Sequence, residues 1–394
     1  MTDDVRGVGR LALVATQHVT DLVEEMHRAI VSGPDVLGRP LARPADELAK
    51  VVFGGVRLIA QAVGAGAERS YAALAPWVEA RAPGPKGDAV RAVMNGVFGD
   101  HLAATGNPLA ITMRLRIDGR PLTLEPAALA AALPDAGGKP LVLLHGSSGN
   151  DRQWLRGGHE HGAALARDLG YTPVWLHYNS GLHISDNGRQ LAGLLEQLVA
   201  AWPVPIAGLT LLGHSMGGLV ARSACHVAEV EGHAWRGKLR KLVFLGTPHH
   251  GAPLERAGNL VHALLGVSKY SAPFKRLARI RSAGVTDLRY GYVLDEHWQG
   301  RDRFATERDA RRGPPLPAGV DCYALAATTA KEMKRALPGD GLVPVKSALG
   351  VHRTAALTLG FPEENLHVAL ATGHLDLLSS PAVYEVLRGW LAAG

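Results

Sequence analysis

The sequence predicts an α/β fold, in which a mostly parallel sheet is covered by helices on both faces. Short, continuous apolar runs recur along the chain, and most of them are followed by a segment with helical periodicity. Strands buried on both faces have such runs, and helices between them make neighbouring strands parallel. We therefore expect strands at six runs, LVLLHG, TPVWLHY, LTLLGH, KLVFLG, CYALAA and LHVALA.

Composition and charge indicate a large globular enzyme domain with an added region. The 394 residues are 47% apolar and 20% charged, which excludes a disordered chain, a collagen-like repeat and a disulfide-dense mini-protein. The net charge of +6 is modest, and the basic residues are scattered apart from two stretches, at 275–281 and 301–312. No nucleic-acid-binding module is recognisable, so we expect no nucleic-acid partner. Cys225 and Cys322 lie in apolar runs and are expected to be free core thiols.

The N-terminal residues do not resemble a secretory signal. Two acids precede the first basic residue, and the segment has neither a continuous apolar stretch nor a small-residue cleavage site. Arg57 and Gln61 interrupt the most apolar window, so no segment approaches the roughly 18 apolar residues of a membrane span. We expect a cytoplasmic protein without a transmembrane segment.

The first 105 residues are predicted to form an all-helical N-terminal extension, residues 1–105. Apolar residues recur at helical spacing from Leu11, and a second such run begins at Leu48 after a Pro-rich break. A third begins around Val90, after the sequence RAPGPKGD. The apolar faces of these helices either pack on the sheet or line an acyl site, and we favour packing.

Residues 106–394 are predicted to form the domain that contains the sheet. The segment ITMRLRI alternates with period two, Asp118-Gly119 supplies a tight turn, and Pro121 to Leu124 return as the partner strand of a hairpin. Residues 252–317, between the fourth and fifth apolar runs, have helical and irregular character and exceed an ordinary connection. This insertion is predicted to be a helical lid or cap.

One motif predicts a nucleophile. The sequence Gly213-His214-Ser215-Met216-Gly217-Gly218 matches G-x-S-x-G, a sharp strand-to-helix turn whose glycines permit a strained backbone that exposes the serine hydroxyl. An apolar strand precedes the motif and helical periodicity follows it, which is the context that the motif requires. Ser215 is therefore the predicted nucleophile.

A serine nucleophile needs a general base and an acid behind that base, and on this architecture the chain order is serine, acid, histidine. His374 lies just past the last apolar run, before a final helix that begins near Pro381, and is the predicted base. Asp340 occupies a Gly-flanked loop after the fifth run and is the predicted acid. Asp376 is the rival, but we expect it to cap the last helix or bond the loop backbone. Four other histidines are expected to be structural or surface residues, His249, His250, His352 and His367.

The oxyanion that forms on nucleophilic attack needs two backbone N–H donors already in position. Met216, at the start of the helix after Ser215, supplies one of them. The second is expected from the loop after the first apolar run, where we favour the N–H of Ser147 over that of Ser148. The candidate substrate-binding residues are neighbours of these groups in the chain, His145, Gly146 and His214.

Histidine is abundant, with 18 copies, but its clusters lack the spacing of a metal site. His159-Glu160-His161 and His249-His250 have neither the i, i+4 pairing nor the cysteine partners of a zinc site. The glycines form no P-loop or dinucleotide-binding motif. We therefore expect no metal and no cofactor.

Five motifs together resemble those of bacterial lipases and esterases of the α/β-hydrolase superfamily, including relatives of the glycosylphosphatidylinositol inositol-deacylase group. They are His145-Gly146, the GHSMGG turn, Gly246-Thr247-Pro248-His249-His250-Gly251, the DGLVP loop at Asp340 and the GHLDLL stretch at His374. The resemblance covers residues 106–394 and implies an α/β-hydrolase fold with an eight-stranded sheet. It also implies a Ser215-Asp340-His374 triad and ester hydrolysis without a cofactor.

The predicted function is the hydrolysis of carboxylic esters, as an esterase or lipase, through an acyl-enzyme intermediate on Ser215. The expected substrate is an ester or a lipid-like small molecule. Two enzymatic alternatives use the same triad, depolymerisation of an aliphatic polyester and acyl transfer to an alcohol or thiol. A non-catalytic alternative is a hydrolase-fold scaffold that binds a partner, which the complete triad disfavours.

Overall fold

The computed structural model describes residues 85–104, 106, 110–252, 282–302, 313–333 and 337–392. The first two helical runs predicted for the N-terminal extension lie outside these residues, and so does most of the predicted lid at 252–317. Both therefore stay predictions. The third run is a helix, α4 (Pro85–Ala104), where the spacing around Val90 predicts one.

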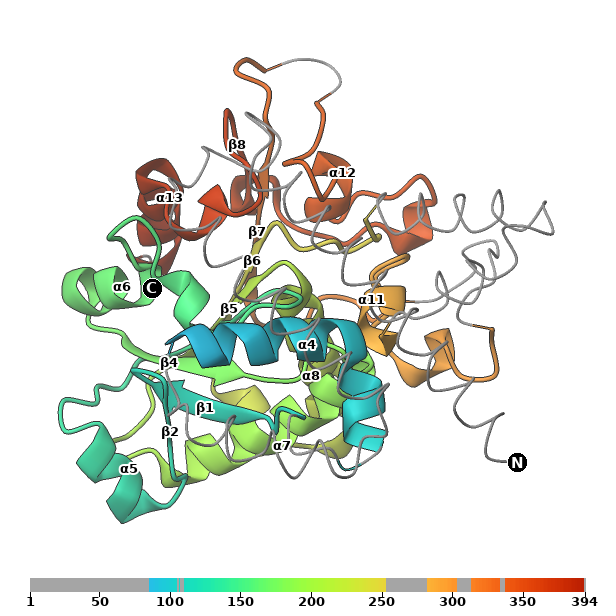
Figure 1. The fold of residues 1–394 in the computed structure, drawn as a ribbon. Helices are drawn as coiled ribbons and strands as arrows, with labels where there is room; N and C mark the ends of the chain where they lie inside the picture. The colour runs from blue at the N-terminus through green and yellow to red at the C-terminus, as the bar shows by residue number, and fades with distance from the viewer. Residues whose placement is uncertain are drawn as a thin grey trace, which may run out of the picture.

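A mostly parallel sheet of eight strands forms the centre of the described structure (Figure 1), which confirms the predicted fold class. The strands are β1 (Arg114–Ile117), β2 (Arg120–Pro121), β3 (Pro140–Leu144), β4 (Thr172–His177), β5 (Leu209–His214), β6 (Leu239–Leu245), β7 (Asp321–Ala327) and β8 (Leu366–Ala369). Their order in the sheet is β2-β1-β4-β3-β5-β6-β7-β8, and the strands from β3 to β8 are parallel. Each of the six predicted apolar runs forms one of these parallel strands.

The first two strands form the predicted hairpin at one edge of the sheet. Asp118 and Gly119 occupy the turn with φ of 51° and 76°, a conformation that Asp and Gly tolerate better than other residues. β1 also pairs antiparallel with β4, which joins the hairpin to the parallel strands. β2 ends at Pro121 and is shorter than the predicted strand, although the Leu122 N–H still donates to Leu115 O (2.8 Å).

Helices cover both faces of the sheet, as the continuous apolar strands predict. In β3, Val142 and Leu144 pack toward one face, whereas Leu141 and Leu143 pack toward the other. All four side chains are 0% exposed, and burying each contributes about 1.5–3 kcal/mol. The first face is covered by α5 (Pro126–Ala132), α7 (Ile184–Ala201) and α8 (Met216–Glu231), the second by α6 (His161–Leu169) and α13 (Pro381–Ala392).

Short helices and 3₁₀ turns lie in the connections. They are α11 (Ala283–Asp287), α12 (Val345–Ala348), η1 (Asp151–Trp154), η2 (Ala234–Gly237), η3 (Asp295–His297), η4 (Ala355–Leu357), η5 (Glu363–Asn365) and η6 (Asp376–Leu378). Cys225 on α8 and Cys322 on β7 are buried free thiols, as predicted. Among the described residues, no helix combines the length and the apolar character that crossing a bilayer requires.

Candidate active site

Ser215 lies at the turn between β5 and α8, with φ of 54° and ψ of −125°. Side chains are rare at positive φ, and holding one there costs about 1–2 kcal/mol. The Ser215 N–H donates to Leu245 O (2.8 Å), which ties the turn to the end of β6. Ser215 is partly exposed, whereas the residues on either side of it in β5 and in the first turn of α8 are buried. The fold therefore presents this serine at the carboxyl edge of the sheet, where open α/β folds bind ligands.

The glycines around Ser215 leave no space for a side chain. A Cβ on Gly213 would lie 2.6 Å from Gly218 Cα, and one on Gly217 would lie 2.5 Å from Leu144 O. The start of α8 thus meets the ends of β5 and β3 backbone against backbone. This close approach is the physical reason for glycine on both sides of the serine in the motif.

Asp340 and His374 are in contact, each on a loop that follows a strand. His374 Nδ1 lies 2.7 Å from Asp340 Oδ2, and the His374 N–H donates to Asp340 O (3.0 Å). Asp340 is 0% exposed, and its Oδ1 accepts hydrogen bonds from Leu342 N (3.0 Å) and Val343 N (2.8 Å). Because a carboxylate only accepts, this arrangement assigns a proton to Nδ1 and leaves the lone pair of Nε2 available. A general base needs that tautomer.

Gly246, the residue after β6, links this pair to the serine turn. A Cβ on Gly246 would lie 3.3 Å from His374 Cε1 and 3.2 Å from Asp340 Oδ2. Gly246 directly follows Leu245, whose carbonyl accepts the Ser215 N–H, so Ser215, Asp340 and His374 lie at the same edge of the sheet. Among the hydrogen bonds between described residues, none joins the Ser215 hydroxyl to His374 in this conformation. Such bonds often tighten only when substrate binds.

Two buried histidines brace the loops around the site. His214 Nε2 is 3.1 Å from His374 O, and burial holds the pKa of His214 well below its usual range. His145 stacks on Tyr178 with ring centroids 4.2 Å apart, its Nδ1 lies 2.8 Å from Gly146 O, and burial lowers its pKa to about 3. Both rings are therefore neutral and enclosed, which favours a supporting role for His145 and His214 over direct contact with substrate. Tyr178 is the last residue of the predicted strand TPVWLHY, and nothing in its local pattern reveals this stacking.

The loop after β3 lies against the serine turn. A Cβ on Gly146 would be 3.0 Å from Ser215 Cβ. Ser148 has φ of 57°, and its N–H donates to Ser180 Oγ (2.9 Å). Because this donor is engaged, the structure favours Ser147 over Ser148 as the loop's oxyanion donor. Met216 is the first residue of α8, where N–H groups have no partner within the helix.

Asp376, the rival acid, bonds the loop backbone. Its Oδ2 accepts a hydrogen bond from Gly373 N (3.1 Å), which closes the turn that carries His374. The carboxylate that contacts His374 Nδ1 is that of Asp340.

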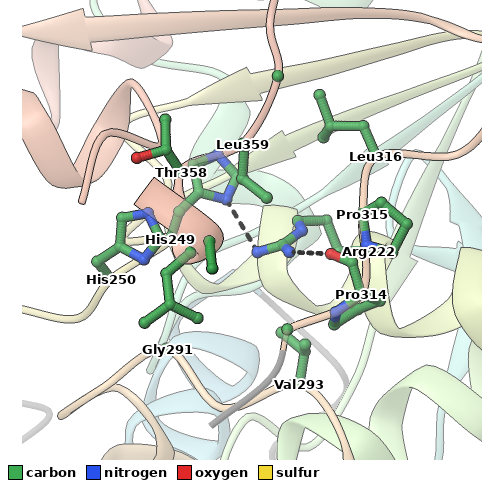
Figure 2. Close-up of a pocket in the computed structure, with 14 residues that line it drawn as sticks. Arg222, His249, His250, Gly291, Val293, Pro314, Pro315, Leu316, Thr358 and Leu359 are labelled. Carbon is green, nitrogen blue, oxygen red and sulfur yellow. Dashed lines mark hydrogen bonds between the residues drawn. The ribbon is translucent and has the colours of Figure 1, made fainter. Parts of the chain in front are cut away.

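A separate cavity of about 160 Å³ lies beside α8 (Figure 2). Arg222, His249 and His250 line it together with loops 313–316 and 356–360. Arg222 Nη2 donates to Pro314 O (2.8 Å), and Nη1 lies 3.4 Å from His249 Nδ1, so the guanidinium joins α8 to two loops. Both histidines are buried, in line with the structural role expected of them. The sequence does not indicate that Arg222 is buried and lines a cavity, because a single charged residue within a helical pattern is usually exposed.

The two histidines of the His159-Glu160-His161 cluster contact each other and a backbone carbonyl. His159 Nε2 lies 2.8 Å from His161 Nδ1, and His161 Nε2 lies 2.9 Å from Leu377 O. Burial lowers the pKa of His161 to about 4. Within the described ranges, no group of three His, Cys, Asp or Glu side chains is arranged to hold a metal ion.

Known proteins resemble this chain in sequence and in fold. Residues 135–310 match the family model of the PGAP1-like alpha/beta domain. A triacylglycerol lipase of Burkholderia plantarii is 30% identical over 138 residues, which are 34% of this chain and 36% of that protein. The chain thus spans about a third of the curated relative's length.

Solved structures of lipases and esterases are also similar to it. The mature lipase BlEst2 of Bacillus licheniformis is 18% identical, with a TM-score of 0.41 over 64% of this chain and 91% of that one. The esterase PF2001 of Pyrococcus furiosus is 13% identical, with a TM-score of 0.36 over 65% and 83% of the two chains. The sheet order and the serine turn of this chain thus accompany partial sequence matches to a PGAP1-like alpha/beta domain and to a triacylglycerol lipase.

Proposed function

We propose that the protein is a serine carboxylic ester hydrolase, an esterase or lipase, that acts through Ser215, His374 and Asp340. The observation that carries the proposal is the 2.7 Å contact between His374 Nδ1 and the fully buried Asp340 carboxylate, at the sheet edge that holds Ser215. A buried acid bonded to histidine beside a strained serine turn is the arrangement that activates a hydroxyl.

In the first half of the reaction, Ser215 Oγ attacks the ester carbonyl while His374 Nε2 accepts the hydroxyl proton. Asp340 holds the ring in this tautomer and stabilises the positive charge that develops on it. The backbone N–H groups of Met216 and Ser147 stabilise the negative charge on the carbonyl oxygen. Collapse of the tetrahedral intermediate transfers the His374 proton to the leaving alcohol and leaves an acyl group on Ser215.

In the second half, water attacks the acyl-enzyme and gives a proton to His374 Nε2. The second tetrahedral intermediate forms beneath the same two N–H groups, and its collapse releases the carboxylic acid and restores the Ser215 hydroxyl. These steps need no cofactor. The substrate we propose is an ester or lipid-like molecule, which the similarity to a triacylglycerol lipase supports.

A chain-length series of p-nitrophenyl esters tests the proposal. We expect Ser215→Ala and His374→Ala each to lower kcat by about 10⁴-fold or more with the fold retained. Ser223→Ala is the control, because Ser223 is a fully buried serine on α8, the helix that follows Ser215. It should keep the wild-type kcat.

The same assay separates the related activities. A lipase should show a rise in rate when the ester forms an oil-water interface, whereas an esterase should show ordinary saturation. Product analysis with an added alcohol distinguishes hydrolysis from acyl transfer. Wild-type turnover by Ser215→Ala would refute the proposed mechanism.

A further inference from the structure

Helix α4 packs on two loops that border the candidate site. Gly96 and Gly99 lie three residues apart, on one face of the helix. A Cβ on Gly96 would overlap the Ser148 hydroxyl and lie 2.9 Å from Ser148 Cα, and one on Gly99 would overlap the Asn179 amide. Asn179 Nδ2 also donates to Gly99 O (2.9 Å). The helix therefore touches both the loop after β3 and the loop after β4.

Ser148, which α4 contacts at Gly96, is the residue that follows the proposed oxyanion donor Ser147. Its φ of 57° is strained for serine, and such conformations persist only where the surroundings enforce them. On one side, the Ser148 N–H is fixed by Ser180 Oγ, and on the other side its Cα and side chain press on Gly96. Two residues earlier, Gly146 packs on Ser215. Ser147 is held between these two contacts.

The helix is fixed at further points, so it is a rigid support for the loop. Ser282 Oγ donates to Gly96 O (2.6 Å), which ties the middle of α4 to the start of α11. In the first turn of the helix, Asp88 pairs with Arg116 of β1 at 3.4 Å. Figure 1 shows α4, in blue, crossing the molecule and reaching α11, which it contacts.

We propose that α4 is a positioning element of the active site and that it acts through Gly96. The glycine holds Ser148 in its left-handed conformation, and this anchor together with the packing of Gly146 on Ser215 fixes the position of the Ser147 N–H between them. This inference rests on the proposed function of Ser215 and Ser147. Oxyanion donors must lie about 2.7–3.1 Å from the developing charge, so a shift of a few tenths of an ångström at Ser148 lowers kcat. The active site then includes a helix that precedes the residues of the α/β sheet.

The variant Gly96→Ala tests the contact. Its Cβ would displace Ser148, and we expect kcat to fall at least about tenfold, within the limit of about 10²–10³ for losing one donor. KM should stay within about twofold, because the donor acts on the transition state. Binding of a trifluoromethyl ketone, which forms a tetrahedral adduct on serine, should weaken by a factor similar to the loss in kcat.

The matched control is Gly193→Ala on α7, where a Cβ meets no atom within 4 Å. It makes the same change within a helix and should keep the wild-type kcat and inhibitor affinity. Alanine in place of a helical glycine should also stabilise this control by about 0.5–1 kcal/mol.

Ser148→Gly keeps the test decisive if Gly96→Ala does not fold. It removes the side chain that α4 contacts and lets φ relax, so kcat should fall with little change in KM. If Gly96→Ala lowers kcat through its contact with Ser148, the double variant Gly96→Ala/Ser148→Gly should have a kcat no lower than that of the less active single variant.

A wild-type kcat in Gly96→Ala or in Ser148→Gly overturns this proposal. A rise in kcat in Gly96→Ala also overturns it, since that result would mean that α4 obstructs the substrate. A different result refutes the proposed function itself: a wild-type protein without esterase activity, or a Ser215→Ala variant as active as wild type.

Discussion

Replacing Asp340 by Asn separates the charge of this buried side chain from its hydrogen bonds. In Asp340→Asn, the amide oxygen can still accept from Leu342 N and Val343 N, as Oδ1 does at 3.0 and 2.8 Å. The amide NH₂ then faces His374 Nδ1 in place of the carboxylate oxygen at 2.7 Å. Because NH₂ donates, the His374 proton moves to Nε2, and the ring can no longer accept the Ser215 proton.

We expect Asp340→Asn to lower kcat/KM by about 10⁴, which is about 5.4 kcal/mol of transition-state stabilisation. The free energy of unfolding of Asp340→Asn should change little, because the hydrogen bonds from Leu342 N and Val343 N are kept. Asp340→Ala leaves both N–H groups without their acceptor, at about 1–3 kcal/mol each, so its free energy of unfolding should fall by about 2–6 kcal/mol.

The assay combines p-nitrophenyl ester kinetics with urea unfolding of both variants. Asp376→Asn is the control, because the Asp376 carboxylate accepts a hydrogen bond from the loop backbone at Gly373 and does not contact His374 Nδ1, so this variant should lose far less activity. The reasoning is refuted if Asp340→Asn keeps activity within tenfold of wild type. It is equally refuted if Asp376→Asn is the variant that loses activity.

Two further predictions concern the serine turn and the buried histidines. Gly217→Ala would place a Cβ 2.5 Å from Leu144 O, so it should cost about 1–3 kcal/mol of stability and lower kcat. Gly389→Ala, where a Cβ meets nothing within 4 Å, should do neither, and equal activity of the two variants would contradict the packing argument. The lowered pKa values of His145 (about 3) and His161 (about 4) mean that the unfolded chain binds protons below pH 6.5 that the folded chain does not. The free energy of unfolding should therefore fall as pH drops from 6.5 toward 4, by up to about 1.4 kcal/mol per pH unit for each histidine. Urea unfolding at a series of pH values measures this slope. A free energy of unfolding that does not change over this range would count against the burial of the two histidines in the neutral form.

The strands of the sheet could be predicted because each is encoded locally. The first four residues of LVLLHG are all apolar, and so short an apolar run between turn residues is typical of a strand with both faces buried. The turn at Ser215 is likewise encoded locally, because the G-x-S-x-G motif and the strand and helix patterns on either side of it specify it. His374 and Asp340 could be proposed from chain order alone, because each follows a recognisable strand.

The supports around the site could not be predicted, because they join residues that are distant in the chain. The bond from Asn179 Nδ2 to Gly99 O spans 80 positions, and the stacking of His145 on Tyr178 depends on the pairing of β3 with β4. The spacing of Gly96 and Gly99 could have indicated that this helix packs closely on another element. Two glycines on one face of a helix weaken it, so their presence favours close packing against another backbone.

Covalent labelling tests the nucleophilic role of Ser215 most directly. The protein is treated with a fluorophosphonate, digested and analysed by mass spectrometry. We predict one adduct, on Ser215, that is lost in Ser215→Ala and retained in Ser223→Ala. An adduct on another residue, or ester hydrolysis by a protein that forms no adduct, would contradict the proposed mechanism.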